Sequence, residues 1–218
     1  MKQILTICII TFFNLSGFSQ TIVDFFESIP DSSILNLTKE QRKEIVKYSI
    51  DNKSKDDAYD DFSNNDIDYA FDIVDIRNGY LRLIGAFEGH IQMCYWNLEN
   101  GNKLISIYFE GCGPVCYIEQ FDFYEYSGEG FKPINWKSII PNVYEDFFGD
   151  NYKQKIEELK EKDILATLLF DLPRNGKNII AKWGNEYSQV TYKEFGIGDR
   201  MELIWNDGEF KKGKIYWK

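Results

Sequence analysis

Apolar and polar residues alternate with a period of two between residues 71 and 126, and turn signals interrupt this alternation about every ten residues. The loops are typical of β-hairpins: Asn78-Gly79, Glu88-Gly89 and Glu99-Asn100-Gly101. Asparagine and glycine adopt the positive φ angles that tight hairpin turns require. This stretch therefore predicts an antiparallel β-meander.

Each predicted loop also sets the register of the two strands that it joins. The expected opposed pairs are Ile76–Leu81, Asp75–Arg82, Val74–Leu83, Ile84–Met93, Tyr95–Ile105, Met93–Ile107 and Ile91–Phe109. In this register one inward face collects the apolar side chains Phe71, Ile73, Ile84, Ala86, Ile91, Met93, Tyr95, Ile105, Ile107, Phe121 and Phe123. The agreement between turns and apolar pattern supports the meander.

Helical signals precede this meander and a second one. Thr38, with Gln41 three residues later, forms a capping box for a helix that extends to about residue 50. Asp150 or Asn151 caps a second helix that ends near Asp163.

After the second helix, Asn175-Gly176 closes a hairpin that places Leu172 opposite Ile179, Phe170 opposite Ala181 and Leu168 opposite Trp183. Further strands are expected at residues 188–192, 201–205 and 215–217, the last two joined through a turn at Asp207-Gly208. The predicted fold class is α+β, with two similar halves (about 20–135 and 136–218) of one globular domain. Each half is a helix followed by an antiparallel β-meander.

The first 19 residues have the pattern of a cleaved signal peptide. Lys2 precedes an apolar run over residues 4–13, and Gly17 and Ser19 place small residues at the −3 and −1 positions of a cleavage site. The run is shorter than the roughly 20 residues of a membrane span. We expect a mature chain that starts at Gln20 and is secreted or periplasmic, without a membrane span.

The charge of the chain excludes some partners. With 25 basic and 35 acidic residues the formal net charge is −10, which disfavours nucleic acids and anionic lipid surfaces. Residues 51–75 hold nine aspartates and two lysines, which suggests a calcium loop, but the EF-hand pattern is absent. We interpret this segment as a solvated acidic connection and expect neither a metal nor a cofactor.

Three cysteines remain after the predicted cleavage: Cys94, Cys112 and Cys116. The Cys112–Cys116 spacing is one residue longer than a thioredoxin motif, and predicted strands flank it instead of a helix. Centring a hairpin on Pro114 places these two cysteines opposite each other, which predicts a disulfide-closed turn with Cys94 unpaired. The same register pairs Ile107 with Phe121, Ile105 with Phe123, and Ser106 with Asp122.

Catalytic signals are few. His90 is the only histidine and lies beside a predicted turn, and no Gly-x-Ser-x-Gly, phosphate-loop or His-Glu-x-x-His pattern occurs. We therefore assign no catalytic residue. A carboxylate-dependent hydrolase such as a glycosidase remains the alternative, because 35 acidic residues offer many carboxylate pairs.

The outward face of the first meander is the candidate binding surface. It combines aromatic, amide and carboxylate side chains: Gln92, Trp96, Tyr108, Gln120, Asp122 and Tyr124. Aromatic rings with polar neighbours suit a sugar or peptide. This predicts a non-catalytic binding module of the cell envelope, whose partner is a protein, peptide or polysaccharide. Alternatively the face packs under the other half, since Leu81 and Leu83 are expected on the same side.

Three sequence segments carry a resemblance to a known family. They are residues 25–32, which read Phe-Phe-Glu-Ser-Ile-Pro-Asp-Ser, the Cys112–Cys116 turn, and Asp122-Phe123-Tyr124 with Trp136 and Pro141 downstream. In these the chain resembles a family of small secreted Bacteroidetes proteins known as a domain of unknown function. The resemblance supports export and the disulfide turn, and it implies no activity, cofactor or catalytic residue.

Overall fold

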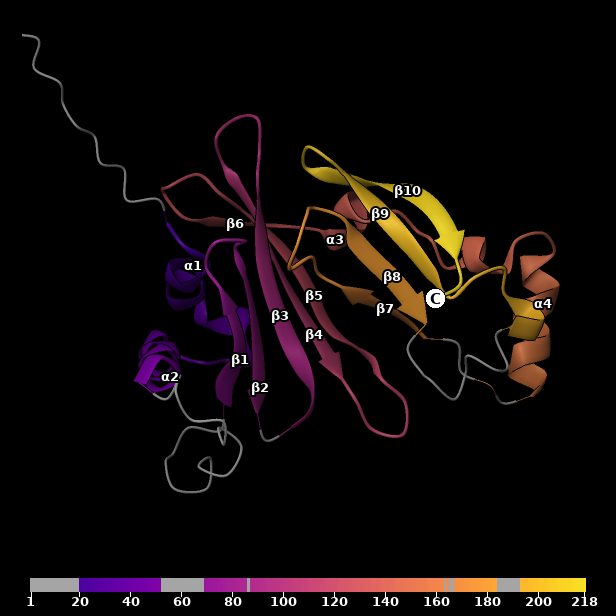
Figure 1. Ribbon diagram of the computed structural model, residues 1–218, viewed down its shortest axis with the longest axis horizontal. Helices are drawn as coiled ribbons and strands as arrows, with labels where there is room; N and C mark the ends of the chain where they lie inside the picture. The colour runs from indigo at the N-terminus through magenta and orange to yellow at the C-terminus, as the bar shows by residue number, and fades with distance from the viewer. Residues whose placement is uncertain (1–19, 52–68, 86, 163, 165–166, 184–192) are drawn as a thin grey trace, which may run out of the picture.

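The computed structural model describes residues 20–51, 69–85, 87–162, 164, 167–183 and 193–218. It is a mixed α+β structure with two antiparallel sheets, as the sequence predicted (Figure 1). The signal-peptide region, most of the acidic connection and the strand expected at 188–192 lie outside the described residues.

The larger sheet, sheet A, has six strands in chain order. Its strands are β1 (Tyr69–Asp75), β2 (Tyr80–Gly85), β3 (Phe87–Asn97), β4 (Lys103–Gly111), β5 (Tyr117–Tyr126) and β6 (Phe131–Ile134). The four strands of sheet B follow the order β10-β9-β8-β7. They are β7 (Leu168–Asp171), β8 (Ile179–Trp183), β9 (Arg200–Asn206) and β10 (Glu209–Tyr216).

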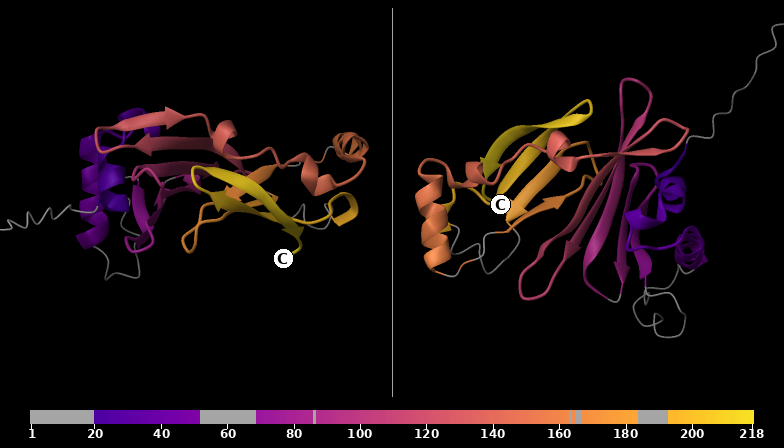
Figure 2. Two further views of the ribbon diagram at one scale, coloured as in Figure 1. Left: turned by 90° about the horizontal axis from the view of Figure 1, so that it is seen from above. Right: turned by 180° about the vertical axis from the view of Figure 1, so that it is seen from behind.

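Helices lead into both sheets. Before sheet A the chain forms α1 (Ile22–Ser28), the short 3-10 helix η1 (Asp31–Ser33) and α2 (Lys39–Asp51). Between the sheets it forms α3 (Trp136–Ile139), η3 (Glu145–Phe148) and α4 (Tyr152–Glu161). Helices α1 and α2 lie on one side of sheet A and sheet B lies on the other (Figure 2).

The predicted capping box at the start of α2 is confirmed. The Thr38 backbone N–H donates to Oε1 of Gln41 at 2.8 Å, and the Gln41 N–H donates to Oγ1 of Thr38 at 3.2 Å. The helix expected after Asp150 is α4, with Asn151 at its N-cap in the left-handed region (φ 64°) and no side-chain cap. A further capping box, Thr21 with Asp24, starts α1.

Sheet A separates two apolar cores. The helix-side core lies between sheet A and α1 and α2, and includes Phe25, Phe26, Leu81, Leu83, Ile91, Met93, Ile105 and Ile107. The inter-sheet core lies between sheet A and sheet B, and includes Tyr80, Cys94, Trp96, Leu104, Tyr108, Phe121, Phe123, Phe170 and Leu203. Both faces of sheet A are therefore buried over much of their area.

Several predicted registers are confirmed. Tyr95 pairs with Ile105, Met93 with Ile107 and Ile91 with Phe109. In sheet B, Leu168 pairs with Trp183 and Phe170 with Ala181. The turn at Asp207-Gly208 is also as expected, because Asn206 pairs with Glu209.

The predicted register of the first hairpin is wrong. Val74 pairs with Leu81 and Asp75 with Tyr80, so four residues, 76–79, form the loop instead of two. The Asp75 carboxylate accepts hydrogen bonds from the backbone and side chain of Asn78, which stabilises the wider loop. A register shift between Phe71 and Ile73 then leaves Asp72, and not Asp75, as the partner of Arg82.

The second hairpin does not turn at Glu88-Gly89. Leu81 pairs with Met93 and Leu83 with Ile91, so these two leucines belong to the helix-side core and Ile84 does not face Met93. Gly89 lies inside β3, where a Cβ atom would be 1.9 Å from the carbonyl oxygen of Glu110. The glycine therefore permits close approach of two strands instead of forming a turn.

The predicted β4–β5 register agrees with the structure only near the disulfide. Glu110 pairs with Ile118, but a shift beside Phe109 then places Ile107 opposite Asp122 and Tyr108 opposite Phe121. The extra residue in β5 moves every later side chain of this strand to the opposite face. Phe121 and Phe123 consequently lie in the inter-sheet core and not on the predicted inward face.

Candidate functional site

The predicted aromatic surface of the first meander is divided between two faces of sheet A. Gln92, Trp96 and Tyr108 are at most 3% exposed and face sheet B. They offer no open surface to a ligand. The alternative interpretation, that this face packs under the second half of the chain, is therefore confirmed for these residues.

Gln92 and Tyr108 have a structural role at the edge of sheet B. Strand β7 is an edge strand, and its outward N–H groups need acceptors. The Phe170 N–H donates to the Tyr108 hydroxyl at 3.0 Å, and the Leu172 N–H donates to Oε1 of Gln92 at 2.9 Å. Side chains of sheet A thus complete the hydrogen bonding of sheet B.

Gln120, Asp122 and Tyr124 face the other side of sheet A because of the bulge in β5. They are half-buried. Nε2 of Gln120 donates to the Ser33 carbonyl at 2.7 Å and to Oδ2 of Asp122 at 2.6 Å. Burial raises the pKa of the Tyr124 hydroxyl. These residues connect β5 to η1 and do not meet Trp96 or Tyr108.

A polar cluster lies near the start of β3 and the end of β4. His90 and Glu110 are directly opposed, and the His90 Nε2 lies 2.8 Å from Nε2 of Gln92. Burial lowers the pKa of His90, and the positive charges of Arg82 and Lys182 lower it further. The histidine is therefore held neutral within a hydrogen-bonded contact.

The cluster also contains a buried acid that the sequence did not reveal. Glu110 is 7% exposed, and burial raises the pKa of its carboxyl. The ammonium group of Lys182 opposes this rise and the Asp171 carboxylate adds to it. Lys182 and Asp171 form an ion pair of 2.5 Å. The available sequence signal was the spacing of Glu110 two residues before Cys112, which places both on one strand face.

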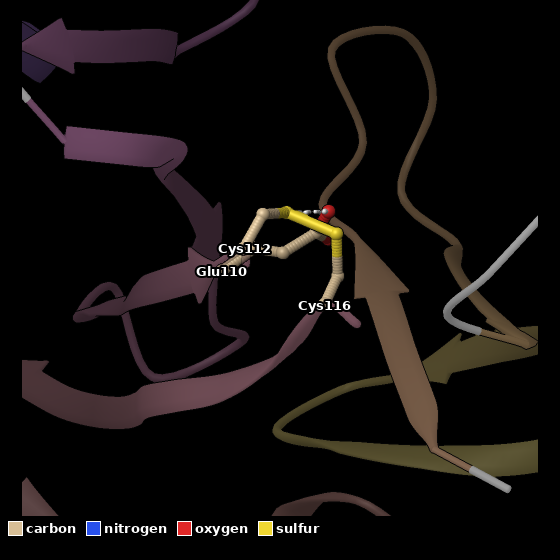
Figure 3. A group of neighbouring side chains, drawn as sticks. All are labelled: Glu110, Cys112 and Cys116. Carbon is tan, nitrogen blue, oxygen red and sulfur yellow. Dashed lines mark hydrogen bonds between the residues drawn. A yellow bond between two sulfur atoms is a disulfide. The ribbon is translucent and has the colours of Figure 1, made fainter. Parts of the chain in front are cut away.

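The predicted disulfide joins Cys112 and Cys116 at the tip of the β4–β5 hairpin, with 4.0 Å between their Cα atoms. Cys94 is free and buried, and burial raises the pKa of its thiol. Figure 3 shows the Glu110 side chain directed at the disulfide, with Oε1 3.8 Å from Sγ of Cys112. Among the described residues, Glu110, Cys112 and Cys116 form a group whose potential metal-ligand atoms all lie within 4.8 Å of one another. Cysteines bind metals as thiolates, and the two sulfur atoms joined in the disulfide are not thiolates.

A second candidate site is a pocket of about 340 Å³ beside α3, lined by Trp136, Lys137, Ile140 and Asn142. Asn135 caps α3 by accepting from the Lys137 N–H at 3.0 Å. The Trp136 ring stacks on Phe121, with 5.7 Å between ring centroids. Sequence reasoning named Trp136 only as part of the family resemblance.

Comparison with known proteins gives a family and a fold. The family described as "Protein of unknown function (DUF3256)" matches residues 14–182. The chain belongs to this family. Within the described residues, no helix is long and apolar enough to cross a membrane.

The fold resembles that of a solved structure, a domain of an uncharacterized protein from Porphyromonas gingivalis W83. The TM-score is 0.61 at 13% sequence identity, over 88% of this chain and 96% of that chain. At this identity the likeness concerns the fold. No curated protein sequence matches the chain.

Proposed function

We propose that this member of the family is an exported, non-catalytic interaction protein of the cell envelope that binds an N-acetylated sugar in the pocket beside α3. The observation that carries the proposal is the combination of side chains on the pocket wall. Trp136 supplies an aromatic plane, Ile140 an apolar contact, and Lys137 and Asn142 hydrogen-bonding groups. Ligand pockets typically join apolar walls to a few polar groups in this way.

Each wall residue matches a part of such a sugar. Phe121 stacks on Trp136 and the Lys137 ammonium lies over the Trp136 ring, 5.8 Å from its centroid, so the apolar face of the sugar ring stacks on Trp136 by displacing this ammonium. The acetamide methyl meets the small accessible part of Ile140, a residue that is 2% exposed, and the acetamide dipole pairs with the amide of Asn142. Lys137 donates to ring hydroxyls. The volume lies at the lower end of the range of about 300–1,000 Å³ for ligand pockets, which suits one or two sugar rings.

Isothermal titration with N-acetylglucosamine oligomers tests this proposal. Wild-type protein should bind the trimer, and it should bind cellotriose, which lacks the acetamide groups, more weakly. Trp136→Ala should weaken trimer binding by about 1–3 kcal/mol through loss of the stacking plane. Asn142→Ala should remove the preference for the acetylated trimer, because the amide no longer pairs with the acetamide.

The control is Trp217→Ala, since Trp217 is 39% exposed and is not part of the pocket wall. It should bind as the wild type does. Lys137 and Asn142 are exposed, so Lys137→Met and Asn142→Ala should fold even if Trp136→Ala does not. Equal affinity for the N-acetylglucosamine trimer and for cellotriose would exclude the pocket as the site of an N-acetylated sugar. Binding that these substitutions leave unchanged would do the same.

The second candidate function is a carboxylate-dependent hydrolase, which the raised pKa of Glu110 favours. A glycosidase acid must touch the glycosidic oxygen. Glu110 is 7% exposed and lies beside the disulfide, so we prefer the binding function. Release of monosaccharide by the wild type but not by Glu110→Gln would reverse this preference.

Export is tested by the intact mass of protein recovered from the periplasm or the medium. The mass should correspond to a chain that starts at Gln20. In the structure the Gln20 side chain donates to the Tyr126 hydroxyl at 2.7 Å, and Thr21 caps α1. A mature start at residue 20 would therefore keep α1 and its anchor intact. Protein that retains Cys8, or that stays with membranes after carbonate washing, would contradict export.

A further inference from the structure

The Glu110 carboxyl is an unusual neighbour for a disulfide that only closes a turn. It is 7% exposed, and its Oε2 has no hydrogen-bond partner among the described residues. An ionised carboxylate is costly to bury, and Lys182 and Tyr108 offset this cost for Glu110 only in part, because burial still raises the pKa of its carboxyl. A disulfide needs no acid for its stability, so closure of the turn by itself does not require this carboxyl.

We propose that Cys112–Cys116 is a redox-active disulfide that oxidises a partner dithiol, with Glu110 as the proton donor to the departing Cys112 sulfur. The proposal rests on the 3.8 Å contact between Oε1 of Glu110 and Sγ of Cys112, and on the burial of this carboxyl, whose Oε2 has no hydrogen-bond partner among the described residues. It does not depend on the sugar pocket.

The reaction is a two-step thiol–disulfide exchange. A partner thiol loses its proton to solvent, and the thiolate attacks Sγ of Cys116. The Cys112–Cys116 bond breaks, its electron pair goes to Cys112, and this sulfur takes the proton of Glu110. The second partner thiol then attacks the mixed disulfide and transfers its proton to Cys116. Solvent returns a proton to Glu110. The partner dithiol is oxidised to a disulfide, and Cys112 and Cys116 are reduced to thiols.

The position of the hairpin explains why Cys116 is attacked and Cys112 leaves. Both cysteines are half-buried, and the tip between them is exposed at Gly113 and Pro114. Tyr117, next to Cys116, is 48% exposed, so a partner can reach this side. Cys112 has the carboxyl beside it, and protonation of the departing thiolate favours its release.

The surrounding charges set the pH range in which Glu110 holds its proton. The groups that face it are His90 on β3, Tyr108 on β4, Asp171 on β7 and Lys182 on β8. Burial raises the pKa of Glu110, Asp171 raises it further, and Lys182 and Tyr108 lower it. The Glu110 carboxyl is thus protonated and can donate below its pKa in the folded protein. It loses this proton as the pH rises through that value.

The test is the rate at which dithiothreitol reduces the native disulfide, measured from about pH 5 to about pH 9 and divided by the dithiothreitol thiolate concentration. For wild type this normalised rate should fall as Glu110 ionises. Glu110→Gln should lower it about tenfold at the acidic end and remove the inflection, because the amide donates no proton. The matched control is Glu119→Gln, an exposed residue of the same hairpin, which should behave as wild type does.

Lys182→Met provides a second variant that keeps Glu110. Loss of the ammonium group should raise the pKa of Glu110 and move the inflection to higher pH. If Glu110→Gln does not fold, the shift of the inflection in Lys182→Met tests whether Glu110 donates the proton. A profile of Glu110→Gln that equals that of Glu119→Gln, or an inflection that Lys182→Met leaves in place, would overturn the proposal. So would reduction of the wild type only at its rate of global unfolding.

Discussion

Trp96→Ala should lower the free energy of unfolding by about 3–5 kcal/mol, the range for removing a buried large aromatic side chain. Trp96 is 3% exposed and belongs to the inter-sheet core. Its ring stacks on Trp205 at 5.5 Å and meets Phe210 edge-on at 5.4 Å. Its Nε1 donates to the Lys177 carbonyl at 2.8 Å. The substitution removes contacts between both sheets and leaves a cavity.

Urea unfolding monitored by far-ultraviolet circular dichroism measures this effect. Trp217→Ala is the matched control, because Trp217 is 39% exposed and should change the stability by much less. A Trp96→Ala variant as stable as Trp217→Ala would show that sheet B does not pack on this face of sheet A in solution. The aromatic face would then be open for ligands, as the sequence had suggested.

Arg42→Met should destabilise the protein by about 2–6 kcal/mol, since each of two buried carbonyls left without a donor costs about 1–3 kcal/mol. The Arg42 side chain is 1% exposed and its guanidinium donates to the carbonyls of Leu37 and Ile29, both buried, and of Glu27. Through these bonds one side chain holds the loop between α1 and α2.

The ion pair of Arg42 with Asp31 should contribute little to this effect. The two side chains approach to 3.0 Å, but Asp31 is 58% exposed and solvent screens the pair. Asp31→Asn is therefore the control and should cost less than about 1 kcal/mol. Both variants can be compared by thermal unfolding at neutral pH. If Asp31→Asn costs as much as Arg42→Met, charge pairing and not carbonyl hydrogen bonding holds the loop.

The family resemblance gains a structural meaning from this loop. Within residues 25–32, Phe25 and Phe26 lie in the helix-side core. The turn that follows them contacts Arg42, which donates a hydrogen bond to the Ile29 carbonyl. The Ser33 carbonyl then accepts from Gln120 on β5. Ser33 directly follows the first of the three segments and Gln120 lies two residues before Asp122, so this hydrogen bond links the neighbourhoods of two segments that carry the resemblance. The third, the disulfide turn, lies at the tip of the β4–β5 hairpin.

Local chemistry was sufficient to predict several elements. The three-residue loop at Glu99–Gly101 set the β3–β4 register, and the Thr38–Gln41 box set the start of α2. Such signals work because the preferred φ angles and the nearby hydrogen bonds belong to the segment itself. The Cys112–Cys116 disulfide was predictable for the same reason, since its hairpin places the two residues in direct opposition.

The assignment of faces could not be predicted from alternation, because β4 is buried along nearly its whole length on both faces. When helices cover one face of a sheet and a second sheet covers the other, a shift by one residue still places apolar side chains in a core. The bulge in β5 determined which face each of its later side chains occupies, and Gly89 allowed the close approach of β3 and β4. The sequence by itself therefore determined the class of the fold, most turns and the disulfide. Tertiary packing decided which side chains met between the sheets, because that depends on partners distant along the chain.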